Sequence, residues 1–335
     1  MLVFSVESSC DETSVCIMQN DKKIFSHIVY SQEIHKKHGG VVPELASRAH
    51  LEILQNITKK AFEDSGLSLR DIDLFSATCG PGLIGGLLIG STFTKSLAIG
   101  LQKPFIPINH LEAHVLSTFF NNEISFPHLC LLITGGHTQI YLLEDLKTIN
   151  LIGETIDDAV GEAFDKVAKI LGLSYPGGYE IEKQAMSGNE NSFELPQPLT
   201  KENNLNFSFS GLKTSINLIS KKNKMDDSFI KNISASFQKC VANILITKLN
   251  KAIKSIDRAR YNNLSASVVG GVANNKYLKK CFENLEKENG IKILYPPEFM
   301  MSDNAAMIAW ATILKYSKSN DLDFKPNPRL TISQS

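Results

Sequence analysis

One structural plan occurs twice along this sequence of 335 residues. In each half, the apolar pattern predicts an antiparallel meander of three strands, then a helix, a strand, a helix, a strand and a closing helix. The elements of the first half are expected at residues 2–6, 14–18, 23–31, 43–64, 74–78, 84–101 and 105–108, with a last helix from 109. Those of the second half are expected at residues 129–134, 139–143, 148–152, 157–171, 266–269, 275–288, 292–295 and 302–316. Such a tandem duplication predicts an α/β protein with two similar lobes.

The length of the chain also favours two domains, because it exceeds the usual size of a single compact core. The repeat predicts a first lobe at residues 1–120 and a second lobe at 121–304, with an insertion at about 176–235. The remaining segment, about 305–335, is expected to pack near the first lobe.

Composition restricts the class of partner and the cell compartment. Lys plus Arg and Asp plus Glu both number 35, so the formal net charge is zero, and any contact with RNA needs local patches or a partner's charge. The six cysteines are scattered without a C-x-x-C pair, which favours reduced thiols in a cytoplasmic protein. The chain opens directly into a strand pattern, and no apolar run is recognised as long enough to cross a membrane, so no membrane association is expected.

A pair of histidines is the first candidate for chemistry. Asn109 is expected to cap a helix, so His110 and His114 lie one turn apart on the same face, as two imidazoles do when they hold one metal ion. Glu112 is turned roughly 200° away from His110, at about 100° per residue, so the helix is not the H-E-x-x-H helix of a zinc protease. Two histidines at this spacing are more often structural, so a third ligand is required.

The repeat supplies a candidate for that ligand. Asp303 begins the closing helix of the second half as His110 begins that of the first. Equivalent helix starts in two related lobes are expected to face each other across the cleft, which brings Asp303 toward the histidines. Two imidazoles and one carboxylate, with coordination positions left open, are typical of a catalytic metal site. The alternative is that Asp303 only caps its helix, a role that Ser302 fills equally well.

Glycine turns indicate where a nucleotide could bind. Four of them, at Gly80, Gly135-Gly136, Gly177-Gly178 and Gly270-Gly271, lie at the ends of predicted strands or helices, where backbone can approach a ligand closely. Residues 80–85 match G-x-G-x-x-G, but Pro81 removes a backbone donor and the preceding meander does not suit a dinucleotide-binding fold.

Three carboxylates near these turns have an open role. Asp165 could accept hydrogen bonds from ribose hydroxyls, although it also belongs to an acidic helix face of the kind that is usually solvated. Asp11 and Glu12 could supply a general base, or could be ordinary turn residues.

Eight strings of residues resemble those of a known family. They are ESSCDETSV at 7–15, GPGL at 80–83, NHLEAH at 109–114, TGGHT at 134–138, GEAFDK at 161–166, YPGG at 175–178, FSFSGLKT at 207–214 and SDNAAMIA at 302–309. In this order they are similar to the TsaD family, also called Gcp/YgjD, which is related to the catalytic subunit of KEOPS. The resemblance covers nearly the whole chain. It departs from the family's usual residues at Thr134, at residues 274–276 and at residues 301–302, where size or polarity is broadly kept.

The resemblance implies a fold and an activity. The implied fold is the duplicated actin/Hsp70-like, or RNase H-like, architecture of two lobes with an interlobe cleft. The implied reaction is transfer of a threonylcarbamoyl group from threonylcarbamoyl-AMP to N6 of the adenosine 3′ of the anticodon in tRNAs that read ANN codons, which forms t6A. The implied partners are tRNA, a TsaB-like paralogue in a heterodimer and a TsaE-like ATPase.

The resemblance also implies site residues. His110, His114 and Asp303 would hold one divalent ion per subunit, Fe(II) or Zn(II), and no organic cofactor is implied. The adenylate would be held by Leu132, Ile133, Thr134, Gly135, Gly136, Asp165, Gly178, Glu182 and Asn275. Asp11 and Glu12 are the candidates for handling the proton.

Two other classes share the expected fold. A sugar or acetate kinase would need phosphate-binding turns and an acid but no pair of metal-binding histidines. A chaperone-like ATPase would match the fold, but the chain has no substrate-binding domain beyond the duplicated core.

Overall fold

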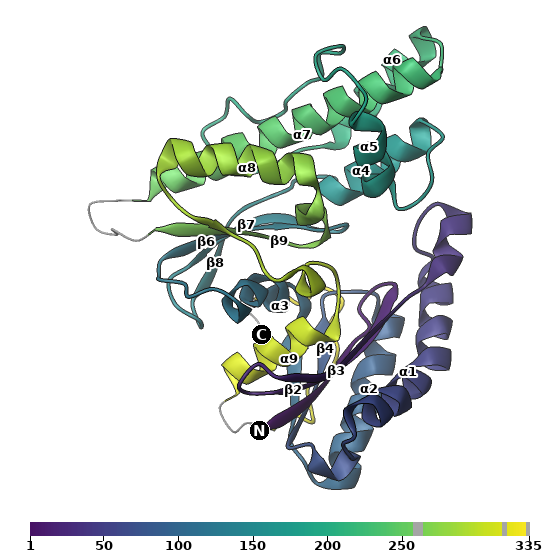
Figure 1. Cartoon of the computed structure of the whole chain (residues 1–335), viewed down its shortest axis with the longest axis vertical. Coiled ribbons are helices and arrows are strands. Elements are labelled where there is room, and N and C mark those ends of the chain that lie inside the picture. The colour runs from purple at the N-terminus through teal and green to yellow at the C-terminus, as the bar shows by residue number, and fades with distance from the viewer. Residues whose placement is uncertain (257–263, 317–319, 333–335) are drawn as a thin grey trace. The chain divides into compact units, whose positions relative to one another are not determined.

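The computed structural model describes residues 1–256, 264–316 and 320–332 (Figure 1). The chain forms two compact units, and each is described by itself. The first unit contains Met1–Asn122 and Pro296–Ser335, and the second contains Glu123–Tyr295.

The first unit is built on a five-stranded sheet with the order β3-β2-β1-β4-β5. The strands are β1 (Leu2–Glu7), β2 (Glu12–Gln19), β3 (Ile24–Ser31), β4 (Leu74–Gly80) and β5 (Phe105–Asn109). The first three form the predicted antiparallel meander, and β4 and β5 run parallel to β1. The carboxyl ends of β1, β4 and β5 therefore lie at the same edge of the sheet, where parallel strands commonly carry a site.

Helices cover both faces of this sheet. Val15 and Ile17 of β2 pack with α1 (Pro43–Ser65) and α2 (Ile84–Leu101). Cys16 and Met18, on the opposite face of the same strand, pack with α9 (Ala305–Lys315). The alternation of buried residues along β2 explains the two layers, because successive side chains point to opposite faces. The short helix α3 (His110–Ser117) follows β5 directly and contacts α9.

Helix α2 corrects one expectation from the sequence. Among the described residues, it is the one helix of at least 18 residues that is apolar enough, by composition, to cross a membrane. The expectation that no apolar run reaches that length is therefore wrong. The helix packs against β4 and α1 and buries Leu87, Thr94 and Ala98, as the core helix of a folded unit does.

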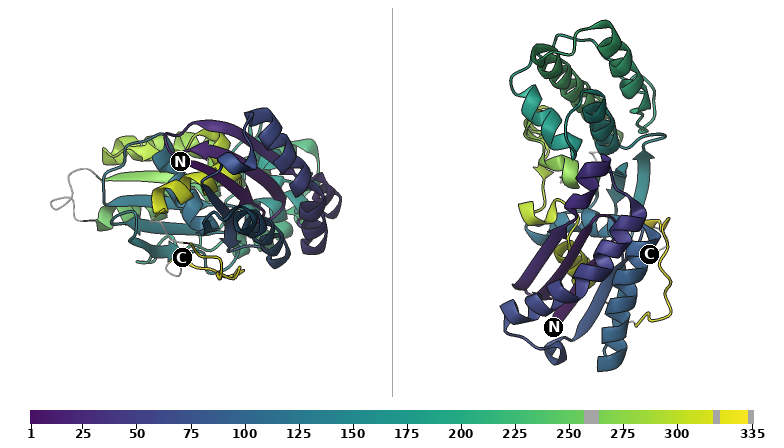
Figure 2. Two further views of the ribbon diagram at one scale, coloured as in Figure 1. Left: turned by 90° about the horizontal axis from the view of Figure 1, so that it is seen from below. Right: turned by 90° about the vertical axis from the view of Figure 1, so that its right-hand side faces the viewer.

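The chain returns to the first unit at Pro296, before the boundary at about residue 305 expected from the repeat. The reason is that Met300 packs with Cys16 and Met18 of β2, so the segment before α9 already belongs to this core. Further along, the amide of Asn327 donates a hydrogen bond to Cys79 in β4. The tail runs along the first unit, as the yellow trace at the right of Figure 2 shows. Residues 317–319 and 333–335 of the predicted tail lie outside the described residues.

The second unit repeats the sheet of the first. Its order is β10-β9-β6-β7-β8, so the five strands occupy the same relative places in both units. The strands are β6 (His128–Ile133), β7 (Thr138–Leu143), β8 (Ile149–Glu154), β9 (Ser265–Val269) and β10 (Ile293–Leu294). This equivalence confirms the duplicated α/β fold predicted from the sequence.

The helices of the second unit include three that the sequence pattern did not resolve. The described helices are α4 (Val160–Ile170), α5 (Gly177–Ala185), α6 (Ser210–Lys222), α7 (Asp227–Ser255) and α8 (Lys276–Asn289). Helices α5, α6 and α7 lie in the segment that separates β8 and α4 from β9. In the part of the chain that the structure describes, the short 3-10 helices are η1 (Glu33–His38), η2 (Leu69–Asp71), η3 (Thr118–Phe120), η4 (Gly271–Asn274) and η5 (Glu298–Met300).

Candidate metal centre and nucleotide site

The histidine helix begins as the sequence predicts. The side chain of Asn109 accepts hydrogen bonds from the amides of Leu111 and Glu112, at 2.9 and 3.2 Å, and so caps α3. His110 and His114 follow one turn apart, with ring centroids 4.8 Å from each other and ring planes at 88°. Both rings are almost fully buried, with 6% and 0% of their residue surface exposed.

Asp303 lies in the turn just before α9. The cap of α9 is Asn304, whose side chain accepts a hydrogen bond from the amide of Met307 at 3.0 Å. The alternative that Asp303 only caps its helix is therefore wrong, and its carboxylate is available for other contacts. The amide of Ala305 donates a hydrogen bond to Oγ of Ser14 at 2.9 Å, which fixes the start of α9 against β2.

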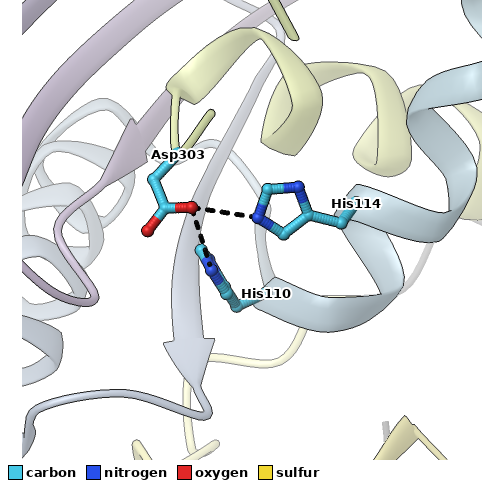
Figure 3. A group of neighbouring side chains, drawn as sticks. All are labelled: His110, His114 and Asp303. Carbon is cyan, nitrogen blue, oxygen red and sulfur yellow. Dashed lines mark hydrogen bonds and ion pairs between the residues drawn. The ribbon is translucent and has the colours of Figure 1, made fainter. Parts of the chain in front are cut away.

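The structure brings the carboxylate and the two imidazoles together (Figure 3). Oδ1 of Asp303 lies 3.0 Å from Nε2 of His114 and 3.5 Å from Nε2 of His110. One ligand atom from each residue lies within 4.8 Å of the others. We expected from the repeat that Asp303 belongs to the second lobe and reaches the histidines across a cleft. Instead, α9 packs in the first unit, so all three residues belong to one unit.

Burial and charge act in opposite directions on these groups. Burial lowers the pKa of His110, but the negative charges of Asp303 and Glu7 outweigh it and hold that pKa well above its ordinary value of 6.5. Burial raises the pKa of Asp303, but the two histidines outweigh it and leave that pKa well below 3.8. For His114, burial dominates and the pKa lies below 6.5. In the absence of a metal ion, His110 is therefore the cation of this cluster.

Glu7 is a member of the cluster that the sequence did not reveal. Its carboxylate accepts a hydrogen bond from Nδ1 of His110 at 3.1 Å. Burial by itself raises the pKa of Glu7, but the charge and hydrogen bond of His110 outweigh burial, so that pKa lies below 4.5. A Glu at the end of an apolar strand gives no sequence signal that separates a buried partner of histidine from an exposed strand end.

The residues present fit a divalent cation. Two imidazole nitrogens and one carboxylate oxygen form the donor set that commonly holds Fe(II) or Zn(II) with positions left open. The neighbouring carboxylate of Glu7, which accepts a hydrogen bond from His110, adds a second negative charge to that of Asp303. A cation compensates this excess of negative charge, which burial otherwise makes costly.

Asp11 immediately precedes β2 and Glu12 is the first residue of that strand, next to this cluster. The two side chains share a hydrogen bond, and burial, followed by the charge of Asp303, raises the pKa of Glu12 well above its ordinary value of 4.5. In the absence of a metal ion, this raised pKa favours the protonated form of Glu12. The backbone carbonyl of Asp11 accepts a hydrogen bond from the amide of Gln32 at 3.1 Å, which fixes this turn against the end of β3.

At the G-x-G-x-x-G match of residues 80–85, the space beside the glycines is filled by other parts of the chain. A Cβ atom at Gly82 would lie 2.6 Å from the carbonyl oxygen of Ser9, and one at Gly86 would lie 2.2 Å from that of Ser8. The amide of Leu83 donates a hydrogen bond to Ser9 at 2.7 Å. These glycines thus admit the loop that follows β1, which explains the motif without a dinucleotide.

In the second unit, the turn at Gly135 and Gly136 packs against the start of α4. The amide of Gly161 donates a hydrogen bond to the carbonyl of Thr134 at 3.3 Å, and a Cβ at Gly161 would lie 2.7 Å from Cα of Gly135. By contrast, no other atom comes within 4 Å of the Cβ positions of Gly135 and Gly136. The outer side of this turn is therefore open for a ligand to approach the backbone.

Other predicted adenylate residues lie on elements linked to each other. Asp165 accepts a hydrogen bond from the amide of Gly177 at 2.7 Å, which places α5, with Gly178, beside α4. Glu182 of α5 accepts a hydrogen bond from the amide of Lys276 at 2.8 Å, at the start of α8. Asn275 caps α8 and also donates from its side chain to Gln238 at 2.9 Å.

Two of the predicted adenylate residues cannot use their side chains. Leu132 and Ile133 lie in β6 with none of their surface exposed. Their side chains belong to the core of the second unit, so only their backbone could contact a ligand. The sequence pattern could have shown this, since both belong to the apolar run of a central strand.

Comparison with protein families and relatives gives one consistent result. The family model described as TsaD, tRNA N6-adenosine threonylcarbamoyltransferase, matches residues 23–310. Proteins of that name from Wolbachia pipientis wMel and Rickettsia rickettsii (strain Sheila Smith) are each 44% identical to this chain, over 98% of it and 97% and 98% of their own lengths. The protein of the same name from Ehrlichia canis (strain Jake) is 46% identical, over 98% of this chain and 95% of its own.

Solved structures with low sequence identity share the fold. HypF from T. kodakarensis has a TM-score of 0.62 at 14% identity, with coverage of 93% of this chain and 47% of HypF. The activator of 2-hydroxyisocaproyl-CoA dehydratase from Clostridium difficile, with bound ADPNP, has a TM-score of 0.53 at 17% identity, with coverage of 94% and 96%. These likenesses confirm the actin/Hsp70-like fold class predicted from the sequence.

Proposed function

The chain belongs to the TsaD family of tRNA N6-adenosine threonylcarbamoyltransferases, and from this premise we propose the details of its reaction. The family makes the protein a transferase that forms t6A in tRNA. The donor proposed here is threonylcarbamoyl-AMP, and the acceptor is N6 of the adenosine 3′ of the anticodon in tRNAs that read ANN codons. The alternatives, a small-molecule kinase or a chaperone-like ATPase, lack a feature that accounts for the histidine pair.

The observation that carries the proposal is the convergence of His110, His114 and Asp303. Members of this family are metal-dependent, and we assign these residues one ion per subunit, Fe(II) or Zn(II), without an organic cofactor. When bound, such an ion supplies Lewis-acid polarisation of an oxygen on the donor. The open positions of a site with three protein ligands suit this role.

The protein's own groups have a limited task in this reaction. The adenine amine is a poor nucleophile because its lone pair is delocalised into the ring, whereas the acyl adenylate is already activated by its phosphate leaving group. Catalysis therefore consists mainly of holding the reactants together and removing a proton from the attacking nitrogen. We assign proton removal to Asp11, because the raised pKa of Glu12 in the metal-free protein favours the protonated form of that residue, and the two side chains share a hydrogen bond.

The second unit is proposed to hold the adenylate. The open side of the turn at Gly135 and Gly136 would let a phosphate approach the backbone closely, and the backbone of Leu132 and Ile133 leads into this turn. The carboxylates of Asp165 and Glu182 can accept hydrogen bonds from ribose hydroxyls. Gly178 and Asn275 complete the proposed set, at the starts of α5 and α8.

Partners and compartment complete the proposal. The zero formal net charge is unusual for a protein that binds tRNA alone, so a partner's charge or local patches would be needed. The resemblance to the family suggests a TsaB-like paralogue in a heterodimer and a TsaE-like ATPase. The place of the reaction is proposed to be the cytoplasm.

The test is reconstitution of the reaction. The purified protein is combined with the two partners, labelled threonine, bicarbonate, ATP, the adenylate-forming enzyme and tRNA, and label is counted in tRNA. We expect label in tRNA with the wild type, none after the metal is removed by a chelator, and recovery when Fe(II) or Zn(II) is added. The His110→Ala variant should lose transfer and keep its circular dichroism spectrum. Normal turnover by metal-stripped protein would contradict the metal assignment. Sugar-dependent release of ADP by the purified protein alone, without the ATPase partner, would favour the kinase.

A further inference from the structure

Glu7 contacts His110 of the proposed metal centre on the Nδ1 side of the ring, away from Asp303. It is the last residue of β1, and none of its surface is exposed. Its Oε2 accepts a hydrogen bond from Nδ1 of His110 at 3.1 Å, whereas Nε2 of the same ring faces Asp303 at 3.5 Å (Figure 3 shows the second contact). An ionised carboxylate can only accept hydrogen bonds, so this contact keeps a proton on Nδ1. Nε2 is then the ring atom that can give up its proton to a metal ion.

The carboxylate of Glu7 is itself held in place. The amide of Ser9 donates a hydrogen bond to Oε1 at 2.6 Å, and the hydroxyl of Thr78 donates to Oε2. Glu7, Thr78 and His110 lie at the ends of β1, β4 and β5, which are neighbours in the sheet. Among the described residues, the one ion pair of Glu7 is with His110. A buried carboxylate with these few partners is costly unless a specific role retains it.

From these contacts, we propose that Glu7 is a positioning residue of the metal centre, which fixes the orientation and the tautomer of His110 so that Nε2 faces the ion. This inference rests on the proposed metal site and adds the group that prepares one of its ligands. Carboxylate groups that accept a hydrogen bond from a metal-binding histidine commonly raise the affinity for the metal.

The two histidines differ in this respect. Nδ1 of His114 is buried and has no hydrogen-bond partner among the described residues. Among the hydrogen bonds of the described residues, Glu7 therefore reaches the ring of His110 and not that of His114. Oγ of Ser9 lies 3.2 Å from Nδ1 of His110 and is the competing candidate for orienting that ring.

The first experiment measures Co(II) affinity of the full-length, metal-free chain from the visible absorption of the bound ion. In the Glu7→Gln variant, the side-chain NH₂ group can take one of two positions. If it faces Nδ1 of His110, it favours the tautomer with the proton on Nε2. If it faces the backbone amide of Ser9, the hydrogen bond from that amide is lost. We expect affinity to fall by about 10- to 100-fold, the usual effect of removing such a partner. Ser8→Ala is the matched control, because Ser8 bonds to Gly86 from the same loop without touching His110, and its affinity should equal that of the wild type. Ser9→Ala should have a smaller effect than Glu7→Gln.

The second experiment uses the wild type, so it does not depend on the folding of a variant. The Zn(II)-bound chain, labelled with ¹⁵N in its histidines, should show His110 with a slowly exchanging proton on Nδ1 and none on Nε2. A proton on Nε2, or Co(II) affinity of Glu7→Gln equal to that of the wild type, would overturn the role of Glu7. An equal loss in Ser8→Ala or a larger loss in Ser9→Ala would do the same. If the wild type binds Co(II) no better than His114→Ala, the metal site itself fails, which is a different outcome.

Discussion

Nε2 of His114 and Oδ1 of Asp303 lie 3.0 Å apart, although 189 positions separate the two residues in the sequence. This contact joins α3 to the turn before α9, and it exists because α9 packs against β1 and β2 of the first unit. The carboxylate therefore reaches the histidines through the core of one unit.

Replacement of Asp303 by Asn should weaken metal binding strongly. The amide keeps the size of the side chain but removes the charge that a cation requires. We expect Zn(II) affinity to fall by more than the roughly 100-fold upper range for an indirect partner, and tRNA modification to be lost with it. Competition with a chromophoric chelator measures the affinity. Asn304→Ser is the control, because Ser also caps helices and should leave the affinity unchanged. Equal affinities of wild type and Asp303→Asn would exclude this carboxylate as a ligand.

Asp11 and Glu12 should differ in their effect on the rate. If Asp11 accepts the proton of the adenine amine, Asp11→Asn should lower kcat by about 10²- to 10⁴-fold, the usual contribution of such a group. Glu12→Gln should lower kcat less, because the raised pKa of Glu12 favours its protonated form and Gln can still donate a hydrogen bond. Single-turnover transfer to tRNA separates this step from product release. The reverse order of effects would assign the proton to Glu12.

The stability of the metal-free protein should depend on pH through His110. The pKa of His110 is raised above its ordinary value of 6.5. Its contribution to the free energy of unfolding is therefore complete below pH 6.5 and is lost as the pH rises through the folded-state pKa. The pKa values of Asp303 and Glu7 are lowered from 3.8 and 4.5. The contributions of these two carboxylates to the free energy of unfolding are therefore present above pH 3.8 and pH 4.5, respectively, and are lost as the pH falls through their folded-state pKa values.

The difference in Tm between wild type and His110→Gln, both free of metal, should thus be largest between pH 4.5 and 6.5. It should shrink on both sides of this window. Metal affinity should weaken as pH falls, because binding displaces the proton from Nε2 of His110. Differential scanning calorimetry at several pH values measures the first effect, and a difference that is constant with pH would contradict it.

The ion pair between Lys315 and Glu112 should stabilise the first unit. The two charged atoms lie 2.6 Å apart, and 27% and 5% of their side chains are exposed. Because Lys315 is partly exposed, Lys315→Met should cost about 2 kcal/mol, less than the roughly 3–5 kcal/mol of a fully buried pair. For a unit of this size, that corresponds to a Tm lower by about 4–8 °C.

An exposed pair provides the control for Lys315. Lys59 and Glu63 lie 3.8 Å apart, with 79% and 62% of their side chains exposed. Lys59→Met should change stability by less than about 0.5 kcal/mol. Equal shifts in Tm for the two variants would show that the ion pair between α3 and α9 stabilises the first unit no more than an exposed ion pair does.

Substitutions at two glycines should distinguish an effect on the stability of the second unit from an effect on binding of the donor. Gly161→Ala places a Cβ 2.7 Å from the carbonyl of Thr134, so it should destabilise the second unit by about 1–3 kcal/mol. Gly136→Ala meets no atom within 4 Å, so its Tm should not change. If the donor approaches this turn, Gly136→Ala should nevertheless raise the KM for threonylcarbamoyl-AMP. An unchanged KM would place the adenylate elsewhere.

Much of the fold could be predicted from the sequence because each element carries a local signal. Helix α2 is found at the predicted residues, 84–101, where a turn of Gly and Pro precedes a long apolar run. The cap at Asn109 was predicted for the same reason, since its side chain acts within its own turn. The repeat then predicted the same succession of strands and helices in both halves, because the same local signals occur twice.

What the sequence left open depends on packing between distant segments. The segment from about residue 305 was expected near the first lobe, but Asp303 was assigned to the second, and only the packing of Met300 and α9 against β2 places Asp303 in the first unit. The role of Glu7 was missed because strand periodicity shows that a side chain alternates, and does not show whether a histidine stands opposite. Helices α5 to α7 occupy a segment without a counterpart in the first half, so the repeat gave no guide there.

The return of the chain to the first unit has a consequence for biosynthesis. The ribosome makes His110 and His114 long before it makes Asp303, and the whole second unit is synthesised in between. A nascent or prematurely terminated polypeptide that stops before residue 303 thus carries the imidazoles without their carboxylate partner. In such a chain the three side chains of the proposed metal site could not yet come together.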